Sequence, residues 1–221
     1  MFGSITHVIY DMDGLLIDTE SLNEKINGEI VQRYGKTFTT EIKIAIAGTT
    51  AINSAKTIIN ILQIPLTVEE YLAERNKLLY PLYSKAPTFP GAIALVQNLA
   101  KNNIPQAIAT SSSRKNFDLK TVNHQDWLKH IDLIICGDDS EIDNGKPAPD
   151  IFLLTAKRSN AQPKNCLVFE DSLSGMQAAI AAGMSVVVVP DPLFDKKLFD
   201  PADLVLDSLA QFDYKTIPSK A

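Results

Sequence analysis

HVIYDMDGLLIDTE, from His7 to Glu20, is the stretch that decides how the rest of the chain is interpreted. The apolar run Val8-Ile9-Tyr10 leads directly into Asp11, a second carboxylate follows at Asp13, and Gly14 frees the backbone to turn. This pattern is typical of a buried strand that delivers two acids to its carboxyl end. In an open α/β sheet that end of the strands forms the ligand crevice. Asp-x-Asp-Gly is also ordinary turn chemistry, so the motif alone is weak evidence for catalysis.

From Gly91 onward, apolar strand-like runs alternate with amphipathic helical patterns. The pattern predicts helices over 91–102, 114–122, 149–159 and 172–182, and strands over 105–109, 131–136, 166–169 and 186–189. Near-continuous apolar strands separated by helices are what a parallel sheet buried on both faces requires. We therefore expect an α/β fold with a doubly wound parallel sheet, and a peripheral or frayed tail after about Gln211.

Residues 20–84 interrupt this alternation with helical patterns alone. The first predicted helix ends at Gly35, and the third covers 52–62. The second covers 39–48, where the alternation of apolar residues would also fit a strand. The fourth begins at a Thr67–Glu70 capping box and ends at about Tyr80. Prolines at 87 and 90 mark the exit from this segment. We expect a helical cap, residues 17–87, inserted by linkers near 16–20 and 84–90 into an α/β core of residues 1–16 and 88–221.

Composition excludes several classes of partner. The chain has 221 residues, a net charge of −5 and no run of Lys and Arg that could form a basic patch, which argues against a nucleic-acid surface. No apolar run reaches membrane-spanning length, and no signal segment precedes the first strand. Cys136 and Cys166 each lie beside an apolar run, which favours buried free thiols in a reducing compartment. We expect a cytoplasmic monomer.

Three further polar clusters follow predicted strands: Thr110-Ser111-Ser112, Gly145-Lys146-Pro147 and Glu170-Asp171-Ser172. Each has a purely structural interpretation. Hydroxyl and Asp-Ser clusters cap helices, and a lysine between glycine and proline is usually an exposed loop cation. Taken together with the first stretch, however, an acid pair, a hydroxyl, a lysine and a second acid pair at the strand ends of one sheet indicate a phosphate site with a metal.

The quoted motifs resemble a known family. DMDGLLIDTE, ATSS, GKPAPD and FEDSLSGMQAAIAAGM, in this order and at these separations, resemble the four motifs of the haloacid dehalogenase (HAD) superfamily of phosphohydrolases. The helical insertion resembles the small helical cap of that superfamily, and the whole chain is most similar to the branch that includes pseudouridine-5'-phosphatase. The resemblance implies a Rossmann-like core, Mg²⁺ as cofactor and an aspartyl-phosphate intermediate.

Phosphate chemistry agrees with what the resemblance implies for the acids. Like charges about 4 Å apart repel by about 4 kcal/mol at an effective dielectric near 20, so a phosphate among carboxylates needs cations. Mg²⁺ matches the Asp11 side chain, the Asp13 backbone carbonyl and Asp171, with Glu170 as a direct or supporting ligand, and Lys146 adds positive charge. Asp11 would attack phosphorus, and Asp13 would protonate the leaving oxygen and then activate water. Asp13 must therefore hold a proton near neutral pH, through burial or neighbouring negative charge.

Other residues are candidates for substrate contacts. The Thr110 hydroxyl and the backbone N–H groups of Met12, Asp13 and Ser111 suit phosphoryl oxygens. Candidates for contacts with the rest of the substrate are Glu20, Gly48, Thr49 and Thr50. Helix-start and turn chemistry explain these last four residues as well.

Three functions are compatible with these motifs. The first is a Mg²⁺-dependent phosphatase of small phosphorylated metabolites. The expected substrates are nucleotide or sugar phosphates, with pseudouridine 5'-phosphate among them. The second is a phosphosugar mutase, but β-phosphoglucomutases carry an arginine after the cap-loop glycine and a histidine early in the first cap helix. Ala51 and Asn23 stand at those positions, which favours hydrolysis. The third is a binding or regulatory protein that has lost catalysis, and the complete set of motif residues argues against it.

Overall fold

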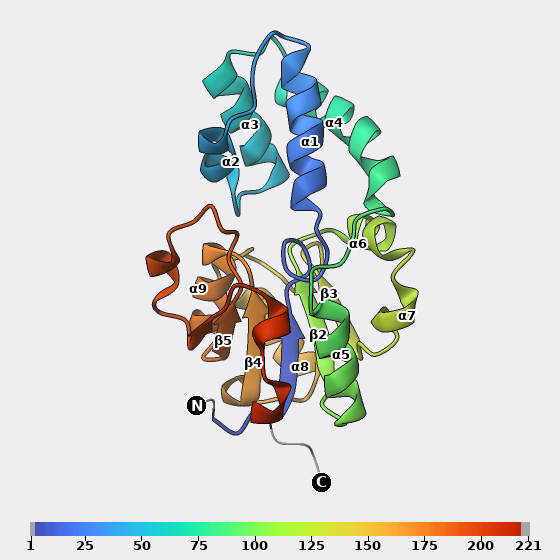
Figure 1. Ribbon diagram of the computed structural model, residues 1–221, viewed down its shortest axis with the longest axis vertical. Coiled ribbons are helices and arrows are strands. Elements are labelled where there is room, and N and C mark those ends of the chain that lie inside the picture. The colour runs from blue at the N-terminus through green and yellow to red at the C-terminus, as the bar shows by residue number, and fades with distance from the viewer. Residues whose placement is uncertain (1–2, 218–221) are drawn as a thin grey trace. The chain divides into compact units, whose positions relative to one another are not determined.

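A computed structural model of the protein describes residues 3–217, which form two compact units. One unit contains the chain up to Asp18 together with the chain from Pro87 onward (Figure 1). The other contains Thr19–Ala86. The first unit is α/β, whereas the regular structure described for the second is helical.

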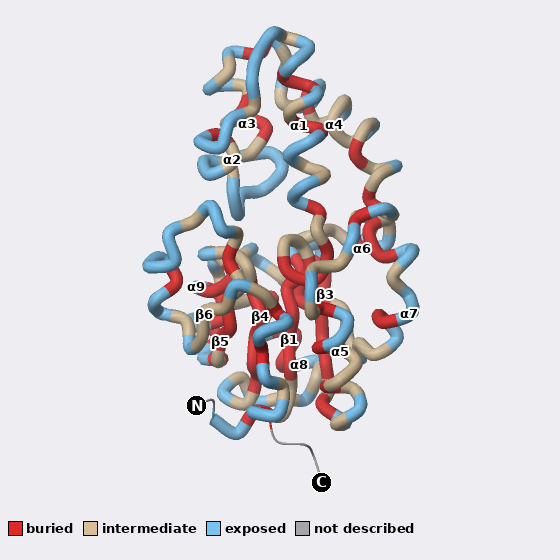
Figure 2. Tube along the Cα trace, viewed as in Figure 1, coloured by how far each residue is buried: buried red, intermediate tan, exposed pale blue. Residues whose placement is uncertain are grey.

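A six-stranded parallel sheet forms the centre of the α/β unit, in the order β3-β2-β1-β4-β5-β6. Its strands are β1 (His7–Tyr10), β2 (Gln106–Thr110), β3 (Leu133–Cys136), β4 (Cys166–Glu170), β5 (Ser185–Val188) and β6 (Leu204–Val205). Strand β1 is central, and its Ile9 pairs with Ala107 on one side and Val168 on the other. Figure 2 shows the middle strands as buried. The predicted doubly wound parallel sheet is therefore confirmed, because strands buried on both faces must be apolar almost throughout.

Helices cover both faces of this sheet. Helix α8 (Asp150–Arg158) packs on β2 and β3, and α9 (Leu173–Ala181) packs on β4 and β5. Figure 1 shows α5 (Ala92–Lys101) in front of the sheet and α8 behind it. Helices α6 (Arg114–Thr121) and α7 (Gln125–Leu128) connect β2 to β3. The carboxyl ends of the strands remain as the edge where side chains from several loops can meet.

The chain after β6 decides between the two alternatives expected for the tail, peripheral structure and fraying. The short 3-10 helices η3 (Leu209–Gln211) and η4 (Tyr214–Thr216) follow β6, whereas η1 (Pro163–Asn165) and η2 (Lys196–Phe199) lie earlier in the chain. Phe212 and Ile217 are buried, and the ring of Phe212 meets the ring of Phe169 edge-on at 4.8 Å. The described part of the tail is therefore peripheral structure packed over apolar surface near β4, and it is not frayed.

The helical unit contains α1 (Glu20–Gln32), α2 (Thr40–Ile46), α3 (Ala51–Leu62) and α4 (Val68–Tyr83). Its predicted helices are all present, including the ambiguous second one. The capping box at the start of α4 is formed as predicted: the Thr67 hydroxyl accepts from the Glu70 N–H, and the Glu70 carboxylate accepts from the Thr67 N–H. Helix α4 continues past the expected end near Tyr80, through Pro81 to Tyr83. Leu79 and Tyr83 are buried, and their packing offsets the hydrogen bond that proline removes.

The two linkers run side by side where they leave the α/β unit. Ile17 forms an antiparallel bridge with Thr88, and the Asp18 N–H donates to the carbonyl of Pro87 at 2.8 Å. Ile17 also bridges to Asp13, so the loop that carries the second acid is tied to the start of the linker. This pairing gives the loop that carries Asp11 and Asp13 a defined conformation.

The two cysteines are free and buried, as predicted. Cys136 ends β3 and Cys166 begins β4. Among the described residues, none of the helices combines the length and the apolar character that a membrane crossing needs.

Candidate active site

The first acid of the opening motif lies at the carboxyl end of the central strand. Asp11 follows β1 directly, and its N–H donates to the carbonyl of Phe169 on β4 at 2.9 Å. Its side chain is buried, and its Oδ1 accepts a hydrogen bond from Lys146 Nζ at 2.6 Å. Burial raises the pKa of Asp11 to about 7, the Lys146 ammonium opposes that rise, and Glu170 and Asp13 add to it. The Lys146 ammonium therefore favours the ionised form of Asp11, against the effect of burial.

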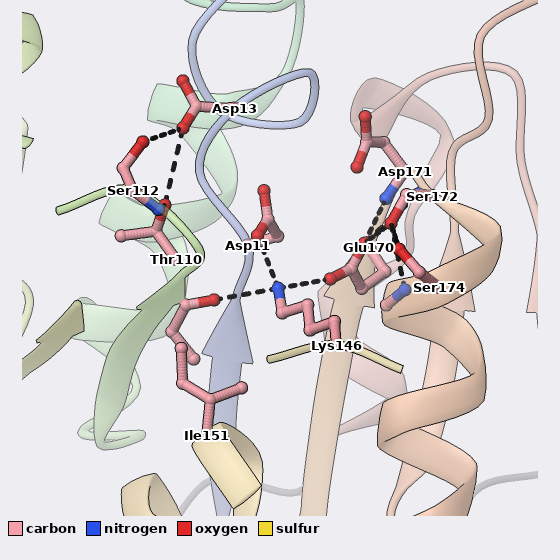
Figure 3. A network of polar contacts seen from close by, with 12 residues as sticks. Asp11, Asp13, Thr110, Ser112, Lys146, Ile151, Glu170, Asp171, Ser172 and Ser174 are labelled. Atoms are coloured by element: carbon pink, nitrogen blue, oxygen red, sulfur yellow. Dashed lines mark hydrogen bonds and ion pairs between the residues drawn. The ribbon is translucent and has the colours of Figure 1, made fainter. Parts of the chain in front are cut away.

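The side chain of Lys146 is 5% exposed, so Lys146 is not an exposed loop cation. Its Nζ donates to Asp11 Oδ1 and to Glu170 Oε1, both at 2.6 Å, and to the carbonyl of Ala109 at 3.1 Å (Figure 3). The ammonium also lies 4.9 Å from the centre of the Phe152 ring. Burial lowers the pKa of Lys146, but the two carboxylates more than offset that effect and the net shift is upward. Lys146 thus stays charged beside Asp11.

Glu170 anchors Lys146 from β4. Its side chain is fully buried, and while Oε1 accepts from Lys146, Oε2 accepts from the N–H groups of Asp171 and Ser172 and from the Ser172 hydroxyl. The Ser172 hydroxyl in turn accepts from the N–H of Gly175 at the start of α9. Both oxygens of Glu170 are engaged in this way, which favours the supporting role for Glu170 over direct contact with a metal.

Two glycines are needed because a carboxylate lies close to the backbone at each of their positions. A Cβ at Gly175 would lie 1.9 Å from Glu170 Oε1, so only glycine leaves space for that carboxylate. A Cβ at Gly14, where φ is +84°, would lie 2.0 Å from Asp171 Oδ2. The Asp171 carboxylate therefore lies against the loop that carries Asp13.

Asp13 faces a different set of groups. Its Oδ2 accepts from Ser112 Oγ at 2.8 Å and, more weakly, from Thr110 Oγ1 at 3.4 Å. Its Oδ1 accepts from Lys120 Nζ at 2.6 Å. The sequence led us to expect burial or negative charge around Asp13, whereas the structure places an ammonium and two hydroxyls there. Figure 3 shows the Asp13 carboxylate turned away from Asp11 and toward Ser112.

The remaining predicted residues divide between the two units. In the α/β unit, the Met12 side chain is fully buried and Ser111 is exposed just after β2. In the helical unit, Glu20 begins α1 and its Oε1 accepts from Asn23 Nδ2 at 3.1 Å. The other three residues form the turn before α3: Gly48 has φ +69°, Thr49 Oγ1 donates to the carbonyl of Ile46, and Thr50 caps α3.

Lys120 is a site residue that the sequence analysis did not identify, and Ser112 was identified there only as a member of the hydroxyl cluster after β2, with no role of its own. The buried positions of α6 are Phe117, Lys120 and Thr121, so Lys120 lies on the apolar face one turn after Phe117. The sequence signal for Lys120 was a lysine at a position that the helical pattern assigns to the buried face of the helix. That indication is weak by itself, because lysines often bury their stems and keep the ammonium in water.

Asp11, Asp13 and Asp171 could hold a divalent cation. No group of three or more His, Cys, Asp or Glu side chains arranged for a metal occurs within residues 3–217. Mg²⁺, however, is usually bound by one or two carboxylates together with waters and substrate phosphate. Side-chain oxygens of Asp11 and Asp171 with the backbone carbonyl of Asp13 form such a set of hard donors, and the close contact between Gly14 and Asp171 brings two of its members together. The residues therefore fit Mg²⁺.

Several known proteins resemble this chain over most of its length. The family model for haloacid dehalogenase-like hydrolases matches residues 8–189. A protein of Arabidopsis thaliana named (DL)-glycerol-3-phosphatase 1, mitochondrial, is 42% identical over 95% of this chain and 72% of its own length. "Probable pseudouridine-5'-phosphatase" of Drosophila melanogaster is 41% identical over 94% of this chain and 91% of its own. The crystal structure of β-phosphoglucomutase from Clostridium difficile matches with a TM-score of 0.78 and 25% identity, covering 96% of this chain and 95% of that one.

Proposed function

We propose a function that proceeds from one established point: the chain belongs to the haloacid dehalogenase-like hydrolase family. It is a phosphoric monoester hydrolase that acts on small phosphorylated metabolites. The observation that best supports a mechanism is the buried pair of Asp11 and Lys146, 2.6 Å apart at the end of the central strand. A carboxylate held beside a permanent cation is suited to attack an anionic phosphoryl group.

In the mechanism we propose, Asp11 is the nucleophile and Asp13 is the acid and base. An Asp11 oxygen forms a bond to phosphorus while the bond from phosphorus to the leaving oxygen breaks, and Asp13 gives its proton to that oxygen. Asp13 then takes a proton from water, which attacks phosphorus and releases phosphate from Asp11. Lys146 offsets negative charge throughout, while the Thr110 hydroxyl and the N–H groups of Met12, Asp13 and Ser111 bind phosphoryl oxygens.

Mg²⁺ is the proposed cofactor, held by Asp11, Asp171 and the Asp13 carbonyl. When bound, the ion supplies positive charge that screens the phosphate from the carboxylates. Removal of divalent cations with EDTA should abolish phosphate release, and added Mg²⁺ should restore it while Ca²⁺ restores less. Full activity in EDTA would contradict the assignment of Mg²⁺.

The substrate we propose is a nucleotide or sugar phosphate, with pseudouridine 5'-phosphate as the first compound to test. The name of the Drosophila relative supports this choice, and the name of the Arabidopsis relative supports glycerol 3-phosphate as its main competitor. Selectivity would come from the helical unit, with Glu20, Gly48, Thr49 and Thr50 as candidates, since the α/β unit handles the phosphoryl group. The test is phosphate release with Mg²⁺ across these two esters, ordinary nucleotides, and hexose and pentose phosphates, ranked by kcat/KM. If the protein released phosphate from none of these esters, the proposed function would be contradicted.

A phosphosugar mutase is the second candidate, because a β-phosphoglucomutase is among the similar solved structures. Ala51 begins α3 and Asn23 lies in α1, where β-phosphoglucomutases would carry an arginine and a histidine. ³¹P NMR of β-glucose 1-phosphate with the enzyme separates the two functions. Inorganic phosphate as the product supports the phosphatase, whereas glucose 6-phosphate supports the mutase.

We further propose that the protein acts as a cytoplasmic monomer on free metabolites. The net charge of −5 argues against a nucleic-acid partner, and the two buried free thiols agree with a reducing compartment. Size-exclusion chromatography with light scattering tests the oligomeric state, and a mass of twice 24.2 kDa would contradict it.

A further inference from the structure

Asp11 and Asp13 each contact a different buried lysine. Lys146 serves Asp11, whereas Lys120 Nζ donates to Asp13 Oδ1 at 2.6 Å. Ser112 completes a closed set of hydrogen bonds, since its hydroxyl donates to Asp13 Oδ2 at 2.8 Å and accepts from Lys120 Nζ at 2.8 Å. We call Ser112 and Lys120 the Asp13 clamp. The two carboxylates are thus held by separate groups from separate parts of the chain.

The burial of Lys120 calls for an explanation. Its side chain is 6% exposed, although it lies in α6, where Lys115 is exposed. A buried ammonium is strongly unfavourable unless a carboxylate and hydrogen-bond acceptors compensate it. Asp13 and Ser112 provide that compensation for Lys120. Asp13 is the more accessible partner of the ion pair, with 21% of its side chain exposed, as a group that meets substrate must be.

In-line phosphoryl transfer explains why Asp13 should be held in this way. The attacking and leaving oxygens lie on opposite sides of phosphorus, so the group that protonates the leaving oxygen must stand apart from the nucleophile. The Asp13 carboxylate meets this condition, because it is turned away from Asp11 toward the end of β2 (Figure 3). Without the clamp, its carboxylate would lose the contacts that define this orientation.

We propose that Lys120 is a positioning residue for Asp13: with Ser112 it holds the acid–base carboxylate on the side of phosphorus from which the leaving oxygen departs. This inference rests on the proposed phosphatase function. Lys120 transfers no proton and makes no bond to substrate. Its effect should therefore appear only where protonation of the leaving oxygen matters, which is for alkyl esters and not for p-nitrophenyl phosphate, whose leaving group departs unprotonated.

The test compares kcat/KM for the best alkyl phosphate of the substrate panel with kcat/KM for p-nitrophenyl phosphate. Each kcat/KM value reports only the steps up to departure of the leaving group, so the comparison isolates the first proton transfer. Lys120→Met should lower kcat/KM for the alkyl ester about 100-fold and for p-nitrophenyl phosphate less than about 5-fold. Lys115→Met removes the same charge from the exposed side of α6 and should change neither value.

Two more variants separate positioning from loss of fold. In an Asp13→Asn background, Lys120→Met should change kcat/KM by less than about 3-fold, because a residue that acts through Asp13 has nothing left to position. Ser112→Ala leaves the ion pair in place and should show the same selective loss at about 10-fold. These two variants decide the matter if Lys120→Met alone proves unfolded by circular dichroism.

The outcomes are distinguishable. Equal losses on both esters in a folded Lys120→Met protein, or a further large loss in the Asp13→Asn background, would overturn the positioning role. An equal loss on both esters for Ser112→Ala would do the same. Absence of phosphate release by the wild-type protein would instead contradict the proposed function.

Discussion

Replacement of Gly175 with alanine tests whether Glu170 organises the site. The added Cβ would lie 1.9 Å from Cδ and Oε1 of Glu170 and 2.2 Å from Oε2. Glu170 is fully buried, and it cannot move aside without breaking its bonds to Lys146 or to the N–H groups of Asp171 and Ser172. The methyl group must therefore separate a buried ion pair or displace the start of α9.

The magnitude follows from opposing terms. Alanine is favoured over glycine within a helix by about 1 kcal/mol. Overpacking a buried site costs about 1–3 kcal/mol, and breaking a buried ion pair costs about 3–5 kcal/mol. These two costs describe one displacement and are not summed. The larger cost, that of breaking the ion pair, less the preference for alanine, predicts that Gly175→Ala lowers the free energy of unfolding by about 2–4 kcal/mol. It should also lower kcat about 100-fold, because Lys146 loses one of the two carboxylates that place it.

Urea unfolding followed by the fluorescence of Trp127 measures this change. Trp127 is the single tryptophan and lies buried in α7 of the α/β unit. Gly28→Ala is the matched control, since Gly28 is also helical but an added Cβ there meets nothing within 4 Å. The control should leave stability unchanged or slightly higher. A Gly175→Ala protein within about 0.5 kcal/mol of wild type would refute the reasoning.

Three more predictions concern the acids and the thiols. Asp11→Asn should abolish phosphate release and leave the fold intact, and retention of a tenth of wild-type activity would contradict the nucleophile assignment. Asp13→Asn should lower kcat/KM for alkyl esters far more than for p-nitrophenyl phosphate, and equal losses would contradict its role as the acid. Burial raises the pKa of Cys136 and Cys166 from 9.0 to about 11, so thiol modification of the native protein should be slow at pH 8 and speed up about tenfold per pH unit. Rapid modification of both thiols at pH 8 would contradict their burial. The folded protein holds the two thiol protons more tightly than the unfolded chain does, so this contribution to the free energy of unfolding is present below pH 9 and is lost as the pH rises through about 11. The urea midpoint should therefore fall between pH 9 and pH 11.

Local patterns in the sequence were enough to predict the sheet, most of the helices and the edge at which the acids meet. The apolar run Val8-Ile9-Tyr10 is enough to predict a buried strand, and Thr67 and Glu70 are enough to predict a capping box. The place of Asp11 then follows from topology, because parallel strands bring their carboxyl ends to one edge. Burial of the tail around Phe212 and the continuation of α4 through Pro81 were not predictable in this way, since both depend on surfaces supplied by distant segments.

Only the tertiary structure decided which charged group meets which acid. Lys146 follows an exposed-looking Gly-Lys-Pro pattern, yet it is buried between Asp11 and Glu170. Lys120 meets Asp13 across 107 positions of sequence. The local pattern around a lysine reports only whether its stem can lie on an apolar surface, and that pattern is the same for a lysine that reaches water and for one that reaches a carboxylate. The partner is set by strand register and by how α6 packs beside the sheet, which are properties of the assembled chain and not of any one segment.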